Sequence, residues 1–318
     1  MARVAAIDCG TNSIRLLVAD VTVRDDGTAW LRDVHREMRV VRLGEGVDRT
    51  GVLSPVALER TRAALADYTA IAVRKGVERA RMVATSATRD AGNRHEFLAM
   101  TERVLGVPAE MISGDEEARL SFAGAAADFD PDDGPFLVAD VGGGSTELVL
   151  GTWDGRRADV TAARSVDIGC VRLTERCLPG DPPTADEITE AVRVATDTLA
   201  AGFAAVPVER TRTFIGVAGT VTTLSAVHMD LPEYDSEVLH LSRMPVDAVR
   251  ATTAKLLAMT RADRAAIGSM HPGRVDVIGG GAIVVRTITD ELARRAGITE
   301  LVASEHDILD GIAFALAV

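Results

Sequence analysis

The chain has 318 residues, of which 47% are hydrophobic and 26% charged, values typical of a globular protein with a sizeable core. Its formal net charge of −12 argues against a protein that coats duplex DNA, because such proteins usually carry a basic surface. A polyanionic substrate held locally by a few arginines is compatible with this charge. The three cysteines (Cys9, Cys170 and Cys177) form no CxxC pair, which argues against a disulfide framework or a cysteine zinc site.

The start of the sequence leads directly into a β-prone segment, and no run approaches the ~18–20 apolar residues that a membrane helix needs. We therefore expect a cytoplasmic protein. The six histidines are scattered without metal-ligand spacing, so most are expected at surface or packing positions: His35, His95, His228, His240, His271 and His306.

In the first half of the chain, three strands precede alternating helices and strands. The hydrophobic pattern predicts strands at residues 4–9, 14–23, 30–41, 81–85 and 109–112, helices at 56–74, 94–105 and 113–127, a turn at 25–28 and a polar loop at 86–93. Ser54 and Pro55 give the first helix an N-cap and a proline at its first position.

After a turn-rich junction at residues 130–135 the same order begins again. The pattern predicts strands at residues 136–141, 145–152, 156–167, 211–215 and 275–278, and helices at 169–177, 185–205, 219–227, 246–259, 262–267, 282–296 and 305–317. Thr184 and Glu187 form a capping box for the long helix. The glycine run 279–281 is expected to cap a strand-to-helix turn.

The two halves begin with similar hairpins. When Asp8 is aligned with Asp140, Gly10 falls on Gly142 and Ser13 on Ser145, so that each copy reads strand, D-x-G-x-x-S turn, strand. Arg15 then occupies the position of Glu147. A duplicated hairpin that opens each half predicts two similar domains facing one another; the alternative is chance similarity between two short apolar segments.

Three consecutive glycines follow Asp140 in the second hairpin. Successive backbone N–H groups in such a turn can form a concave anion site, and glycine lets a ligand approach closely. Asp140 and Glu147 flank the turn, and carboxylates beside an anion site suit a metal ion next to a phosphate. A plain hairpin with a glycine-rich turn is the alternative interpretation.

Several segments resemble a known family. The two hairpin turns, together with Gly216–Thr220 and Gly279–Ala282, resemble the phosphate and glycine turns of the actin–sugar kinase–Hsp70 superfamily. Thr85–Asn93 (TSATRDAGN) and Ile112–Leu120 (ISGDEEARL) resemble the exopolyphosphatase/guanosine pentaphosphatase family more narrowly.

The resemblance implies an α/β fold of two RNase-H-like (actin-like ATPase) domains, with five-stranded mixed sheets flanking an interdomain cleft. We expect an N-terminal domain at residues 1–125 and a C-terminal domain at 126–303, with a last helix at 304–318 that packs back on the first domain. A hinge near residues 124–135 and a homodimer are expected by the same analogy.

The resemblance also implies roles for acidic residues. Glu117 matches the glutamate that orients or deprotonates the attacking water; the alternative is a carboxylate that only complements the dipole of its helix. Asp140 and Glu147 are candidate ligands for Mg²⁺, with Mn²⁺ as a substitute and no organic cofactor. Asp8 is a third candidate ligand, or else an aspartate that bonds its own turn.

Phosphate oxygens are expected to be held mainly by backbone N–H groups. The candidates are Asn12, Ser13, Gly143, Gly144, Ser145, Gly219 and Thr220. Arg89 is the expected side-chain clamp, because a guanidinium binds phosphate in a bidentate way. Asn93 either orders the loop or touches the substrate.

The expected function is an exopolyphosphatase that releases terminal orthophosphate from inorganic polyphosphate by metal-assisted attack of water. Short chains are the expected substrates, because longer family members carry additional C-terminal helical domains. The alternatives are a guanosine pentaphosphate 5′-phosphohydrolase, an ATP-dependent kinase with an adenosine pocket near residues 279–281, and a non-catalytic phosphate-sensing protein.

Overall fold

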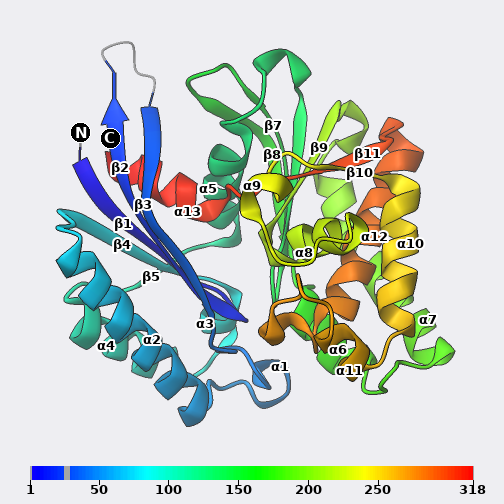
Figure 1. The fold of residues 1–318 in the computed structure, drawn as a ribbon, viewed down its shortest axis with the longest axis horizontal. Helices are drawn as coiled ribbons and strands as arrows, with labels where there is room; N and C mark the ends of the chain where they lie inside the picture. The colour runs from blue at the N-terminus through cyan, green and yellow to red at the C-terminus, as the bar shows by residue number, and fades with distance from the viewer. Residues whose placement is uncertain (1, 25–28, 318) are drawn as a thin grey trace.

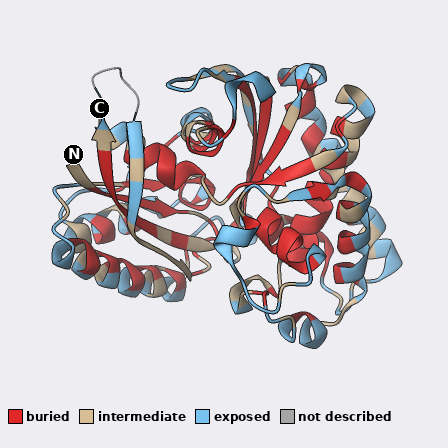
Figure 2. Cartoon of the chain, turned by 45° about the horizontal axis from the view of Figure 1, so that its top comes forward, coloured by how far each residue is buried: buried red, intermediate tan, exposed pale blue. Residues whose placement is uncertain are grey.

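The computed structural model describes residues 2–24 and 29–317, so the turn expected at 25–28 lies outside the described residues. Two mixed sheets stand side by side, each with helices on both faces (Figure 1). Buried residues run along both sheets, whereas the outward faces of the helices are exposed (Figure 2). Within the described residues, no helix is long and apolar enough to cross a membrane.

The first sheet has five strands in the order β3-β2-β1-β4-β5. They are β1 (Ala2–Cys9), β2 (Ser13–Val23), β3 (Ala29–Val40), β4 (Arg79–Ala84) and β5 (Glu110–Met111). One face is covered by α2 (Pro55–Arg74) and α4 (Arg94–Leu105), and α2 begins as expected, with the Ser54 hydroxyl accepting the Ala57 N–H at 3.2 Å. The expected polar loop at 86–93 instead contains a short helix, α3 (Ser86–Asp90). Another short helix, α1 (Val47–Thr50), lies between β3 and α2.

The second sheet repeats this order and adds one strand, giving β10-β11-β9-β6-β7-β8. The strands are β6 (Phe136–Val141), β7 (Thr146–Trp153), β8 (Ala158–Val166), β9 (Thr213–Val217), β10 (Arg243–Pro245) and β11 (Glu300–Ala303). The prediction of two mixed sheets is confirmed, but the second has six strands rather than five. Its fifth strand in the repeated order is β11, and β10 pairs with β11 at the edge.

Helices after β8 pack around the second sheet. They are α6 (Cys170–Cys177), α7 (Ala185–Ala205), α8 (Ala218–His228), α9 (Ser236–Leu239), α10 (Val246–Ala258), α11 (Arg261–Ala265) and α12 (Ile278–Ala296). The capping box of α7 is confirmed, with Glu187 N–H donating to the Thr184 hydroxyl at 3.3 Å. Leu199, Leu224 and Leu292 enter the core that these helices share with the sheet.

The prediction of a strand at residues 275–278 is wrong, because α12 begins at Ile278 and includes the glycine run. These glycines serve helix packing. A Cβ atom on Gly280 would lie 2.4 Å from Thr174 Oγ1, and one on Gly281 would lie 2.5 Å from Thr220 Cγ2. The run therefore lets α12 press against α6 and α8, and it does not cap a strand-to-helix turn.

Two helices connect the sheets. The helix α5 (Gly114–Ala126) packs on the second sheet through Phe122, whereas α13 (Ile308–Ala317) packs on the first sheet through Ile308 and Ile312. They also pack against each other (Figure 1). A Cβ atom on Gly124 would lie 1.9 Å from the Asp307 carbonyl oxygen, so the crossing requires glycine there. The domain boundary at residues 125/126 stays a prediction.

The hairpin repeat seen in the sequence is present in the strand register. Asp8 lies opposite Arg15 across β1 and β2, and Asp140 lies opposite Glu147 across β6 and β7. The turns also match: Gly10 N–H donates to the Ser13 carbonyl at 2.9 Å, and Gly142 N–H to the Ser145 carbonyl at 3.1 Å. The two halves therefore correspond in strand register and turn geometry as well as in sequence.

Candidate active site

The two hairpin turns touch one another between the sheets. A Cβ atom on Gly143 would lie 2.8 Å from Thr11 Cβ, and one on Gly144 would lie 2.8 Å from both Thr11 Oγ1 and Ser86 Oγ. Thr11 and Ser86 are themselves hydrogen-bonded through their hydroxyls at 2.8 Å. Glycine is therefore needed at these two positions for close approach of the turns.

A cavity of about 100 Å³ lies where the turns meet. Nine of the predicted site residues line it: Asp8, Asn12, Ser13, Glu117, Asp140, Gly143, Ser145, Gly219 and Thr220. Three others do not line it but adjoin residues that do: Arg89 contacts Glu117, Gly144 lies between Gly143 and Ser145, and Glu147 is the cross-strand partner of Asp140. Asn93 exchanges two hydrogen bonds with the Leu53 backbone, so it orders the loop.

Asp140 and Glu147 are buried carboxylates on neighbouring strands, 7% and 1% exposed. Each accepts one hydroxyl hydrogen bond, from Ser121 Oγ to Asp140 at 2.7 Å and from Ser165 Oγ to Glu147 at 2.7 Å. Burial, followed by repulsion from Asp307, raises the pKa of Asp140 to about 6. Burial and the charges of Glu117 and Asp140 raise the pKa of Glu147 well above its usual range.

Glu117 lies in the first turn of α5, which Ser113 caps by accepting the Glu116 N–H at 3.2 Å. Its carboxylate is 8% exposed and accepts a hydrogen bond from Arg89 Nη1 at 2.8 Å. Arg89 also donates to the Ile112 carbonyl at 3.0 Å, which fixes its position. Burial raises the pKa of Glu117 to about 7 even though Arg89 acts in the opposite direction. A base with this pKa is suited to proton transfer near neutral pH.

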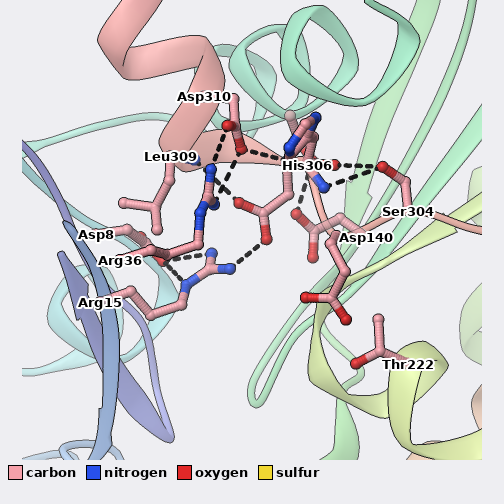
Figure 3. Close-up of polar contacts among 12 residues, drawn as sticks. Asp8, Arg15, Arg36, Asp140, Thr222, Ser304, His306, Leu309 and Asp310 are labelled. Carbon is pink, nitrogen blue, oxygen red and sulfur yellow. Dashed lines mark hydrogen bonds and ion pairs between the residues drawn. The ribbon is translucent and has the colours of Figure 1, made fainter. Parts of the chain in front are cut away.

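Arg15 is the cation of the first hairpin. It donates to Asp8 Oδ2 from Nη2 at 2.7 Å and from Nε at 3.1 Å (Figure 3). It also forms an ion pair with Asp307. Burial nevertheless raises the pKa of Asp8, because desolvation outweighs the attraction of Arg15. The other carboxylate oxygen of Asp8, Oδ1, is buried and has no hydrogen-bond partner among the residues that the structure describes.

These observations fit a divalent cation. Like charges directly opposite one another on neighbouring strands are destabilising, and Asp140 and Glu147 form such a pair without a cationic side chain between them in the described contacts. Asp8, which carries an unpartnered carboxylate oxygen among the described residues, lines the same cavity. Hard cations take carboxylate oxygens as ligands, so Asp8, Asp140 and Glu147 are the residues that would hold one.

Sequence reasoning missed two residues of the site. Arg274 comes from the 3₁₀ turn Pro272–Arg274, and its guanidinium lies so close to Gly219 that a Cβ there would be 2.1 Å from Nη2. Asp307 precedes α13 and pairs with Arg15. Neither belongs to a recognisable motif.

Ala218 has φ 68°, an unusual left-handed conformation for a non-glycine residue. It lies within Gly216–Thr220, a segment that the sequence had already indicated as a glycine turn.

A wider cavity of about 520 Å³ adjoins the small one. The two share the lining residues Arg15, Ala218, Gly219 and Arg274. Arg36 adds a further cation to the wider cavity, and Tyr234 adds an aromatic ring. Glu37, Glu305 and Asp307 line it as well, so the wider cavity carries both guanidinium and carboxylate groups.

Two duplicated β-hairpin turns between actin-like sheets, with buried carboxylates and arginines around them, define a phosphate-handling enzyme of the actin-like class. The sequence profile of the Ppx/GppA phosphatase family matches residues 21–315. The chain belongs to this family.

Relatives and solved structures agree. The chain is 54% identical to "Exopolyphosphatase 2" of Mycobacterium tuberculosis, with 100% of this chain and 99% of that protein covered. It is 45% identical to a crystal structure of an exopolyphosphatase-like protein, with a TM-score of 0.92 over 99% of this chain and 98% of the other. The Aquifex aeolicus PPX-GPPA enzyme is 29% identical, with a TM-score of 0.78 and 99% of each chain covered.

Proposed function

We propose that this chain is an exopolyphosphatase, which hydrolyses the terminal phosphoanhydride bond of inorganic polyphosphate and releases orthophosphate. The observation that carries the proposal is the position of Glu117. This buried carboxylate, with its pKa raised to about 7, lines the same small cavity as both hairpin turns. The relative named "Exopolyphosphatase 2" supports the same activity.

In the proposed reaction, backbone N–H groups of the two turns hold the terminal phosphate, together with Arg274. Water attacks the terminal phosphorus, the bond to the bridging oxygen breaks, and Glu117 accepts the proton of the water. Arg89 holds one oxygen of Glu117 and leaves the other to face the water. Mg²⁺ held by Asp8, Asp140 and Glu147, or Mn²⁺ in its place, would neutralise charge on the phosphate oxygens.

The wider cavity would receive the phosphates that follow the terminal one. Three guanidinium groups line it (Arg15, Arg36 and Arg274), and because Arg15 and Arg36 already pair with aspartates, Arg274 is the cation that would meet the chain. Its limited size favours short polyphosphate. Guanosine pentaphosphate is the second candidate, because Tyr234, Met38 and Met270 give the same cavity an aromatic and apolar wall suited to a nucleobase.

A phosphate-release assay tests these proposals. Short polyphosphate, long polyphosphate and guanosine pentaphosphate would each be incubated with the enzyme, with and without Mg²⁺. We expect Mg²⁺-dependent release that is fastest with short polyphosphate. Faster release from guanosine pentaphosphate would favour the nucleotide, whereas transfer of phosphate from ATP to an acceptor without free phosphate would indicate a kinase.

We further propose that the enzyme is a cytoplasmic homodimer, as family analogy suggests. Sedimentation equilibrium would measure the mass, and a value equal to that of one chain would contradict the dimer. Cell fractionation would test the compartment.

A further inference from the structure

Three side chains outside the active site form a compact group of metal-ligating type. They are Asp128, His240 and His306, and one ligand atom from each lies within 4.8 Å of the others. His306 Nδ1 is 2.6 Å from Asp128 Oδ2, and His240 Nε2 is 3.5 Å from the same oxygen. The two imidazole rings are tilted by 42° to one another, with centroids 4.6 Å apart.

The three residues come from three separate segments. Asp128 lies between α5 and β6, where the chain passes from the first sheet to the second. His306 lies between β11 and α13, where the chain returns. His240 follows α9 on the second half. The group therefore links the two segments that connect the sheets.

Local hydrogen bonds hold this group in place. His306 N–H donates to Ser304 Oγ at 3.1 Å, and Ser304 Oγ donates to the His306 carbonyl at 2.9 Å (Figure 3). Glu305 N–H donates to His240 Nδ1 at 3.3 Å, so that Nε2 is the atom directed at Asp128. A metal bound by His240 Nε2 would require the ring proton to lie on Nδ1. The long contact between the Glu305 N–H and Nδ1 would then be lost and replaced by the metal bond.

Solvent can reach the group. The side chains of Asp128, His240 and His306 are 31%, 22% and 35% exposed, which gives an ion a path of entry. The nearby guanidinium of Arg36 is neutralised by Asp310 at 2.5 Å and Asp33 at 2.7 Å. Its charge therefore adds little repulsion against a cation at Asp128.

We propose that Asp128, His240 and His306 bind Zn²⁺ or a similar late divalent transition metal. The bound ion acts as a clamp, because it holds together the two segments that connect the sheets. Two imidazoles and one carboxylate form a donor set typical of Zn²⁺, with water completing the coordination. Mg²⁺ prefers oxygen ligands, so it is directed to the carboxylates of the active site and not to this group. The two sites are thus chemically separate.

Zn²⁺ binding to the full chain tests the proposal. It would be measured by titration calorimetry with excess Mg²⁺ present, and Co²⁺ would be added separately to give the absorption spectrum of a histidine-bound ion. We expect His240→Gln and His306→Gln each to weaken Zn²⁺ binding at least about tenfold, because even outer-shell changes cost that much. His95→Gln, an exposed histidine on α4, is the matched control and should bind as the wild type does.

Zn²⁺ binding at the active-site carboxylates must be distinguished from Zn²⁺ binding at Asp128, His240 and His306. A double variant, Asp140→Asn with Glu147→Gln, should keep the Zn²⁺ site. If this double variant loses Zn²⁺ binding while His306→Gln retains it, the proposal is overturned. Imidazole resonances of the wild-type chain give a test that needs no variant: Zn²⁺ should shift those of His240 and His306 first, and shifts confined to other histidines would also overturn it.

The clamp predicts a change in local opening. Amide hydrogen exchange at residues 127–130 and 304–307 should slow when Zn²⁺ is added to the wild type, and should not change in His306→Gln. Equal slowing in both proteins would contradict a clamp at this group.

Discussion

At the residue scale, the two hairpins differ in charge at one position. Arg15 and Glu147 occupy equivalent places opposite an aspartate. The first hairpin therefore contains its own counter-charge, whereas the second presents two carboxylates that need an external cation. The same backbone thus supplies an internal ion pair on one side of the cavity and a metal-binding pair on the other.

Glu117→Gln should abolish hydrolysis while phosphate binding survives, because the amide keeps the shape of the side chain but cannot accept a proton. The expected loss in kcat is about 10²–10⁴-fold, the usual contribution of a general base. Steady-state kinetics and phosphate binding would be measured side by side. Glu116→Gln, an exposed neighbour paired with Arg81, is the control and should retain activity.

The raised pKa of Glu117 makes stability depend on pH when divalent cations are removed. Between its unfolded value of 4.5 and its folded value of about 7, the folded state binds more protons than the unfolded state. The free energy of unfolding should therefore fall as pH rises through this window, by about 3 kcal/mol for this group.

Urea unfolding in EDTA at about pH 5 and about pH 8 would measure this slope. Glu117→Gln should make it shallower, and so should saturating Mg²⁺, which compensates the charge of the neighbouring carboxylates. A free energy of unfolding that rises with pH across this window would show that burial does not raise the pKa of Glu117.

Motifs in the sequence placed Asp8, Glu117 and Asp140 in one site, because each lies within a few residues of a recognisable turn or helix start. Arg274 and Asp307 could not be placed in the same way. Their roles depend on contacts with Gly219 and Arg15, which lie far away in the sequence. Only the fold brings these partners together.

At the scale of elements, hydrophobic periodicity was sufficient where elements are long. The predicted helix at 185–205 and the strand at 136–141 agree with α7 and β6 residue for residue. β10 has three residues and β11 four, too few to show a period. The apolar residues before the glycine run suggested a strand, but tight packing of α12 needs glycine inside a helix, where propensity disfavours it.

Asp307 connects α13 to the active site. It is 3% exposed, accepts the Leu309 N–H at 3.0 Å, and pairs with Arg15. Asp307→Asn should lower stability by about 3 kcal/mol, because it leaves a partly buried cation short of one partner. It should also lower kcat more than it raises KM, since Arg15 loses its fixed position beside the cavity.

Chemical denaturation and steady-state kinetics would test both effects of Asp307→Asn. Asp33→Asn, an exposed partner of Arg36, is the control and should change neither quantity appreciably. An unchanged kcat in Asp307→Asn would show that Arg15 does not depend on this contact.

At the scale of the whole molecule, three ion pairs join the two halves of the chain. Arg176 pairs with Asp48 at 2.5 Å, Arg42 pairs with Asp276 at 2.5 Å, and Arg172 pairs with Asp90. All join the loops and short helices around the first sheet to α6 or the α11–α12 region. Partly exposed pairs of this kind are screened by salt.

Arg172→Ala should raise KM several-fold with little change in kcat, because it weakens closure without touching the reacting atoms. Salt at about 0.5 M should bring the wild type close to the variant, since screening removes the same attraction. Kinetics at two salt concentrations would measure both. Arg193→Ala, whose partners lie on its own helix, is the control; equal salt sensitivity of KM in wild type and Arg172→Ala would contradict the role of this pair.

The crossing of α5 and α13 has a consequence for how the molecule can be divided. Each sheet is covered on one face by a helix whose sequence neighbours belong to the other sheet. A chain cut between residues 129 and 135 would give two fragments, each without a complete core. Neither should fold alone, yet mixing them should restore a native complex, and circular dichroism of the separate and mixed fragments would show it. The two similar halves are therefore expected to be obligate partners in folding.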